Sequence, residues 1–265
     1  MYVDSHCHLS FPELQQHLPE VLQRMQAAQV SAALCVCTTL EEYPQVLDIA
    51  QRAPQLWASV GVHPDNEGVQ EPTVADLVER VRAHPEKVVA IGETGLDYYR
   101  LNGRSVADMA WQRERFRVHI RAALETGLPL IIHTRSASDD TLQILRDEGQ
   151  GRVRGVFHCF TETQAVAEAA LALGFHISLS GIVTFRNAED LRAVARMVPA
   201  DRLLIETDSP YLAPVPHRGK PNSPEYVPFV AAELARQRGT TPEAIGALTG
   251  ANFESLFRVQ LPASA

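Results

Sequence analysis

The sequence of 265 residues predicts an α/β protein, a (β/α)8 barrel of the TIM type, in a single domain spanning residues 1–265. Two observations carry this prediction. Eight short β-rich runs follow one another, and their starts lie 23 to 41 residues apart, which leaves room for a helix in each interval. Continuous apolar strands that alternate with helices are typical of a parallel sheet covered on both faces. Eight such units favour a closed barrel over an open sheet.

The strands are expected, in order, at residues 1–9, 31–39, 56–64, 87–97, 128–135, 153–160, 176–181 and 203–210. Helical patterns fill the intervals, for example over residues 12–29, 73–84 and 110–127. The proline-rich segment 210–228 follows the last strand and is expected to be a long loop, where functional residues often concentrate. The sequence contains no flexible linker, low-complexity tract or internal repeat that would divide the chain.

The composition excludes some classes of function. A formal net charge of −8 argues against broad electrostatic clamping of a nucleic-acid duplex. No apolar run approaches the roughly 20 residues that span a bilayer, and the first residues show no signal-peptide pattern. The four cysteines are too few for a disulfide framework.

Cys159 follows His158 in its strand and is expected to point away from it. We expect a cytoplasmic protein without membrane association or an obligate protein partner.

Ligand-type side chains end six of the eight predicted strands. The first strand ends with His6 and His8, which share a face because side chains two positions apart on a strand point the same way. The carboxyl ends of the strands carry the active site in essentially all barrels of this type. A single histidine at a strand end is more often a structural residue than a metal ligand. Six strands that each place a ligand-type residue at the same end of the barrel nevertheless predict a metal site. The residues are His6, His8, His63, Glu93, His133, His158 and Asp208.

The number of candidate ligands predicts two metal ions. Without His63, four histidines (His6, His8, His133 and His158) and two carboxylates (Glu93 and Asp208) exceed the needs of one four-coordinate ion and suit two ions that share a ligand. A lysine bridge is excluded because Lys87 begins its strand and Lys220 follows the last strand, so Glu93 is the expected bridge. Nitrogen-rich ligation favours Zn²⁺ or Mn²⁺ over Mg²⁺, which such a site can still accept. The remaining ligands are His6, His8 and Asp208 on one ion and His133 and His158 on the other.

Seven motifs in order resemble the TatD family of metal-dependent deoxyribonucleases, which are amidohydrolase-like barrels. They are "DSHCHL", "GVHPD", "GETGLDYY", "LIIHTR", "FHCF", "ETDSPYLAP" and "RGKPN", and the likeness runs from residue 2 to about residue 257. The resemblance implies the same six metal ligands, a substrate-site role for His63, and positions beside it for Arg218 and Asn222. Two positions depart from the family pattern: Ser136 replaces an acidic residue, and Ser223 replaces a glutamate.

The resemblance implies hydrolysis of DNA phosphodiesters from 3′ ends. Two metal ions activate a water and polarise a phosphoryl oxygen. We expect Asp208 to accept the proton of that water, and Arg218 with Lys220 to balance the phosphate charge. The alternative is hydrolysis of a carbonyl ester or amide, such as an aminoacyl ester on tRNA. A non-catalytic barrel with structural metals ranks last, because structural sites are closed by their ligands.

Overall fold

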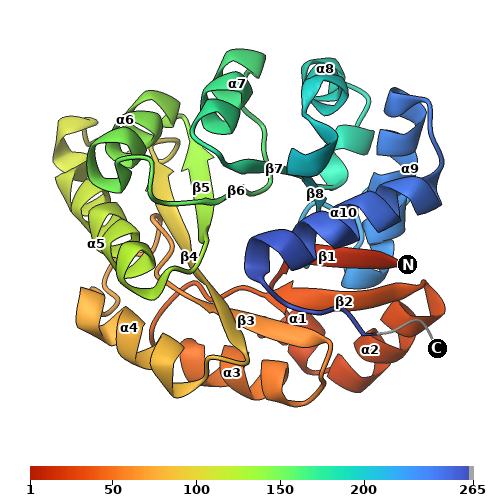
Figure 1. Cartoon of the computed structure of the whole chain (residues 1–265), viewed down its shortest axis with the longest axis horizontal. Helices are drawn as coiled ribbons and strands as arrows, with labels where there is room; N and C mark the ends of the chain where they lie inside the picture. Colours follow the sequence, from red (N-terminus) through yellow and green to blue (C-terminus); the bar gives the residue numbers. More distant parts are fainter. Residues whose placement is uncertain (263–265) are drawn as a thin grey trace.

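The computed structural model describes residues 1–262, which form a single-domain barrel of eight parallel strands surrounded by helices (Figure 1). Every strand overlaps its predicted run, so the predicted fold class is confirmed. The last three residues of the predicted domain, 263–265, lie outside the described residues. The strands are β1 (Tyr2–Cys7), β2 (Val30–Cys35), β3 (Leu56–Val60), β4 (Val88–Asp97), β5 (Leu130–Arg135), β6 (Gly155–Phe157), β7 (His176–Leu179) and β8 (Leu203–Ile205).

Helices follow the strands as expected, with one difference at the start of the chain. The predicted helix over residues 12–29 is divided at His17, because a proline is tolerated only in the first turn of a helix and Pro19 therefore begins a new one. The α-helices are α1 (Pro12–Gln15), α2 (Leu18–Ala27), α3 (Tyr43–Gln51), α4 (Val74–Ala83), α5 (Ala110–Thr126), α6 (Ser138–Gly149), α7 (Gln164–Ala172), α8 (Glu189–Met197), α9 (Val227–Arg238) and α10 (Pro242–Phe257). Short 3₁₀ helices are η1 (Ala107–Met109), η2 (Gly181–Thr184), η3 (Ala200–Arg202) and η4 (Pro224–Tyr226).

The barrel closes where the carboxyl ends of β1 and β8 meet. The strands are hydrogen-bonded in sequence order from β1 to β8, and a parallel bridge between Cys7 and Ser209 joins the two edges. The amide of Asp208 donates to the carbonyl of His6 at 3.0 Å, and the amide of His8 donates to the carbonyl of Ser209 at 2.8 Å. The closing hydrogen bonds therefore hold three of the predicted metal ligands next to one another.

The opposite end of the barrel is filled by apolar side chains. Phe253 and Phe257 of α10 pack in one cluster with residues that occupy the second position of their strands: Val3, Trp57, Val89, Ile131 and Leu204. Because these positions lie at the amino ends of the strands, α10 closes that end and leaves the carboxyl end open. Within residues 1–262, no helix combines the length and the apolar character needed to cross a membrane.

The β4–β5 pair depends on a glycine. Gly95 pairs with His133 and has a φ of +133°, and a Cβ at this position would overlap the His133 carbonyl oxygen. A side chain here would force the two strands apart at the point where both deliver candidate ligands.

We expect Gly95→Ala to lower the free energy of unfolding by at least about 1–3 kcal/mol, because overpacking and backbone strain add. Gly103→Ala is the matched control: its φ is +82°, but a Cβ there meets nothing within 4 Å. Urea unfolding of both variants measures the difference. Equal losses in the two variants would show that the β4–β5 approach is not a constraint.

Candidate metal centre

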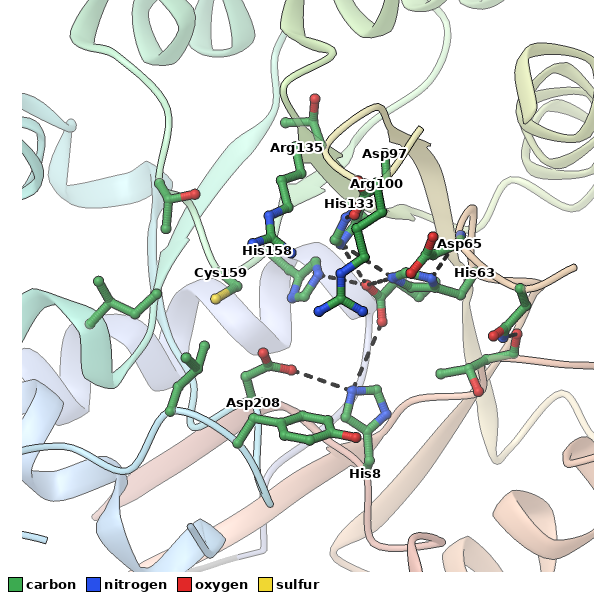
Figure 2. Close-up of a pocket in the computed structure, with 18 of the residues that line it drawn as sticks. His8, His63, Asp65, Asp97, Arg100, His133, Arg135, His158, Cys159 and Asp208 are labelled. Atoms are coloured by element: carbon green, nitrogen blue, oxygen red, sulfur yellow. Dashed lines mark hydrogen bonds and ion pairs between the residues drawn. The ribbon is translucent and has the colours of Figure 1, made fainter. Parts of the chain in front are cut away.

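The carboxyl end of the barrel holds a cavity of about 630 Å³ into which most of the predicted site residues project (Figure 2). His8, Glu93, His133, His158 and Asp208 line it, together with His63. His6 lies behind this lining and is fully buried. The structure therefore brings all six predicted ligands and His63 into one cluster.

Glu93 lies at the centre of the cluster, and its two carboxylate oxygens face different partners. Oε2 lies 3.4 Å from His6 Nε2 and 3.9 Å from His8 Nε2. Oε1 lies 2.8 Å from His158 Nε2, 3.2 Å from His133 Nδ1 and 3.2 Å from His63 Nε2. The two carboxylate oxygens thus contact different histidines, while the rings of His6 and His158 stack on each other with centroids 3.8 Å apart.

Asp208 belongs to the group of His6 and His8. Its Oδ1 lies 3.3 Å from His8 Nε2 and 3.6 Å from His6 Nε2. The backbone at Asp208 has a φ of 55°, a left-handed conformation that costs a non-glycine residue of order 1–3 kcal/mol and is characteristic of functional sites. The closing turn of the barrel holds the carboxylate in this orientation.

Three histidines of the cluster are oriented by an acceptor on their outer ring nitrogen. His133 Nε2 lies 3.0 Å from Asp97 Oδ2, and His158 Nδ1 lies 3.2 Å from Glu206 Oε1. His8 Nδ1 lies 3.3 Å from the carbonyl oxygen of Val36. An N–H donated outward leaves the other nitrogen with its lone pair directed at the centre, as in histidine–metal sites.

The orienting carboxylates Asp97 and Glu206 are not among the residues predicted from the sequence. Their positions in the sequence could have indicated both residues. Asp97 ends the same strand that carries Glu93, and Glu206 precedes Asp208 by two positions. Glu206 is fully buried, and its Oε2 has no hydrogen-bond partner among the described residues.

The loop that carries His63 is held from outside the barrel by α5. Buried Arg115 donates from Nη1 to the carbonyl of His63 at 2.8 Å and also pairs with Glu71. His119 Nε2 accepts from the amide of Val62 at 2.9 Å. Burial lowers the pKa of His119 to about 4, so this imidazole is neutral and keeps its acceptor at physiological pH.

The histidines stabilise the charged forms of the two carboxyl groups at the centre. Burial alone would raise the pKa of Glu93, but the surrounding histidines, His158 first among them, bring it well below its usual value. The pKa of Asp208 is also lowered, since a hydrogen bond from His8 and the nearby His6 overcome the effect of burial. Both groups are therefore carboxylates at neutral pH.

The donor set fits divalent cations. Two pairs of ring nitrogens approach closely, His6 Nε2 with His8 Nε2 at 3.2 Å and His63 Nε2 with His133 Nδ1 at 3.4 Å. Ring nitrogens this close are joined either by a hydrogen bond between the two rings or by a shared cation. Three groups have ligand atoms close enough to share an ion: His6, His8 and Glu93; His6, His158 and Glu206; His63, Glu93 and His133.

Three residues predicted to contact substrate do not line the cavity. Asn222 is fully buried, and its Nδ2 donates to the carbonyls of Thr207 at 2.8 Å and Tyr211 at 2.6 Å, so it braces the loop after β8. The guanidinium of Arg218 lies 3.7 Å above the Phe185 ring, and Lys220 is exposed elsewhere in the same loop. The arginines that do line the cavity are Arg100 and Arg135.

Two further sequence expectations are resolved by local contacts. Cys159 lines the cavity with His158, so the expectation that it points away is wrong: its φ of 41° ends the strand alternation (Figure 2). Ser223 donates to Glu225 at 3.0 Å, and Glu225 pairs with Arg24 at 2.6 Å, which anchors the loop without a glutamate at 223. Ser136 is exposed, and nothing in the structure explains its departure from the family pattern.

A parallel barrel whose open carboxyl end holds buried histidines and carboxylates has the architecture of the barrel metallohydrolases. The chain belongs to the TatD related DNase family, which it matches over residues 3–258, and it is a metal-dependent hydrolase.

Individual relatives cover almost the whole chain. The uncharacterized metal-dependent hydrolase YcfH of Escherichia coli K12 is 47% identical over 97% of this chain and 96% of its own. The 3′-5′ ssDNA/RNA exonuclease TatD of Salmonella typhimurium is 34% identical over 91% and 92%. The crystal structure of YJJV, a TatD homologue from Escherichia coli K12, superposes with a TM-score of 0.90 at 30% identity and covers 98% of both chains.

The orienting role of Asp97 is testable by metal binding. Asp97→Asn keeps the shape of the side chain but removes the charge that holds His133, so we expect divalent-metal affinity to fall about 10- to 100-fold. Isothermal titration calorimetry with Mn²⁺ measures this change.

Asp65→Asn is the matched control, since Asp65 lines the same cavity and its carboxylate makes no hydrogen bond to a histidine within the described residues. Equal affinities for the Asp97 variant and the wild type would remove Asp97 from the metal centre.

Proposed function

We propose that this protein hydrolyses DNA phosphodiesters from 3′ ends and that Glu93 bridges two divalent metal ions, with Zn²⁺ or Mn²⁺ favoured over Mg²⁺. His6, His8 and Asp208 would hold one ion, and His133 and His158 the other. The observation that carries this proposal is the division of the cluster by Glu93, whose Oε2 faces His6 and His8 while Oε1 faces His133 and His158. Nitrogen-rich ligation supports the choice of metals.

Ions at these positions would polarise a phosphoryl oxygen and lower the pKa of a water towards about 7. The side chains of the protein would position the substrate and accept the proton of the attacking water. Asp208, anionic at neutral pH and 14% exposed at its side chain, faces the cavity and would accept the proton of the attacking water on the oxygen that does not contact His8. His63, 19% exposed at its side chain, would contact the substrate.

The substrate is proposed from the family. The Salmonella relative named as a 3′-5′ ssDNA/RNA exonuclease supports nucleic acid as the substrate and the 3′ end as the point of attack. All four cysteines are free thiols, which supports a reducing, cytoplasmic location.

The proposal is tested with single- and double-stranded DNA labelled at the 5′ end. With Mn²⁺ or Zn²⁺ we expect progressive shortening from the 3′ end, and a chelator should abolish it until metal is restored. An aminoacyl ester on tRNA serves as the competing substrate. Ester hydrolysis without DNA shortening, both with metal present, would replace the nuclease proposal with the carbonyl-ester alternative.

The bridge is tested separately by two substitutions. Glu93→Gln should lose both ions and reduce turnover about a thousandfold, because the several kcal/mol of charge stabilisation from the metals is lost. His158→Ala should lose mainly one ion. Metal analysis after loading and desalting, alongside the nuclease assay, distinguishes them. A Glu93→Gln protein that keeps two ions and near-normal turnover would require a different bridge.

A further inference from the structure

Two arginines face the metal centre without a carboxylate partner. Arg100 and Arg135 line the cavity, and neither guanidinium forms an ion pair or a side-chain hydrogen bond with any of residues 1–262. Arg135 instead lies 3.6 Å above the ring of Tyr99. Figure 2 shows both arginines on the side of the cavity that carries His133 and Asp97. Although the chain has a net charge of −8, the two guanidinium groups make this side of the cavity a local site for an anion.

Two aromatic rings occupy the other side. Phe11 stacks on His8 with ring centroids 4.7 Å apart, and Tyr211 meets Phe11 edge-on at 6.1 Å. The amide of Tyr211 donates to the carbonyl of Asp208 at 3.0 Å, which ties the tyrosine to the same turn. Figure 2 places His8 and Asp208, which these two aromatic residues contact, on the opposite side of the cavity from Arg135 and Asp97.

The exposure of Tyr211 is unusual for a fixed aromatic residue. It is 55% exposed and lines the cavity, while buried Asn222 holds its carbonyl at 2.6 Å. An exposed ring on a braced backbone loses little entropy when a flat ligand stacks on it. Bases stack on such rings irrespective of sequence, and guanidinium groups pair with phosphate oxygens in a bidentate manner.

We infer that Phe11, Tyr211, Arg100 and Arg135 bind the unpaired end of a nucleic-acid strand. The terminal base stacks on Tyr211 and Phe11, and Arg100 and Arg135 pair with the adjoining phosphates, which positions a linkage at the metal centre. A cavity of about 630 Å³ has the size of a small-molecule site and suits a terminal nucleotide. This inference rests on the proposed nuclease function and adds the residues that hold the strand end.

Turnover by the wild-type protein separates the two proposals. A wild-type protein that fails to shorten single-stranded DNA with metal present refutes the nuclease function and this inference with it. When the wild type does cleave, the inference depends on the variants alone.

The stacking role is tested with oligonucleotides that carry either a normal or an abasic 3′-terminal nucleotide. Stacking of about 1–3 kcal/mol per base predicts that the wild type prefers the normal end by about 5- to 150-fold in kcat/KM. Tyr211→Ala should lose this preference, and Tyr211→Phe should keep it. Phe229→Ala is the control, because Phe229 is 36% exposed but does not line the cavity.

The phosphate role is tested by binding of an oligonucleotide with phosphorothioate linkages at several salt concentrations. The slope of log Kd against log salt should decrease by about 0.7 for each phosphate that the Arg100→Ala/Arg135→Ala protein no longer binds. Arg152→Ala, an exposed arginine outside the cavity, should leave the slope unchanged. Base preference retained in Tyr211→Ala, or an unchanged slope in the double arginine variant, would overturn the inference.

Discussion

The carboxylate of Glu93 is the group on which the rest of the site depends. A buried carboxylate is unfavourable unless it is paired, and this one, 3% exposed at its side chain, lies within 3.9 Å of nitrogens from five histidines. The orienting carboxylates Asp97 and Glu206 add negative charge behind the rings. The carboxylates raise the pKa of His8, His133 and His158 despite their burial, and a metal ion on each side of Glu93 would balance the charge in place of the protons on these rings. The proposed two-ion hydrolase follows from this single charge distribution.

The backbone of the barrel supports this distribution of charge at two places. Closure of β8 onto β1 brings Asp208 to His6 and His8, while glycines allow β4 to approach its neighbours where Glu93 projects. A Cβ at Gly61 would overlap the backbone of Gly92, immediately before Glu93. Stability and function are therefore coupled at the carboxyl end, whereas the amino end, filled by α10, contributes packing alone.

The sequence alone predicts the strands and the candidate ligands, because apolar runs and the residues that end them are local features. It does not predict the orienting contacts, since Asp97 and Glu206 are 36 and 48 positions from the histidines they meet. The conformation of the loop after β8 is even harder to predict from the sequence. The family resemblance places Asn222 beside the substrate, but its amide is used by Thr207 and Tyr211, and its burial depends on how residues 210–222 fold back. Arg100 follows β4 and Arg135 ends β5, and only the tertiary structure directs them into the cavity.

If one carboxylate divides two metal ions, anomalous diffraction from crystals soaked in Mn²⁺ should reveal both ions. Two anomalous peaks are expected, one beside each oxygen of Glu93, with His6, His8 and Asp208 around the first and His133 and His158 around the second. A single peak at full occupancy, or two peaks neither of which touches Glu93, would show that Glu93 does not bridge two ions.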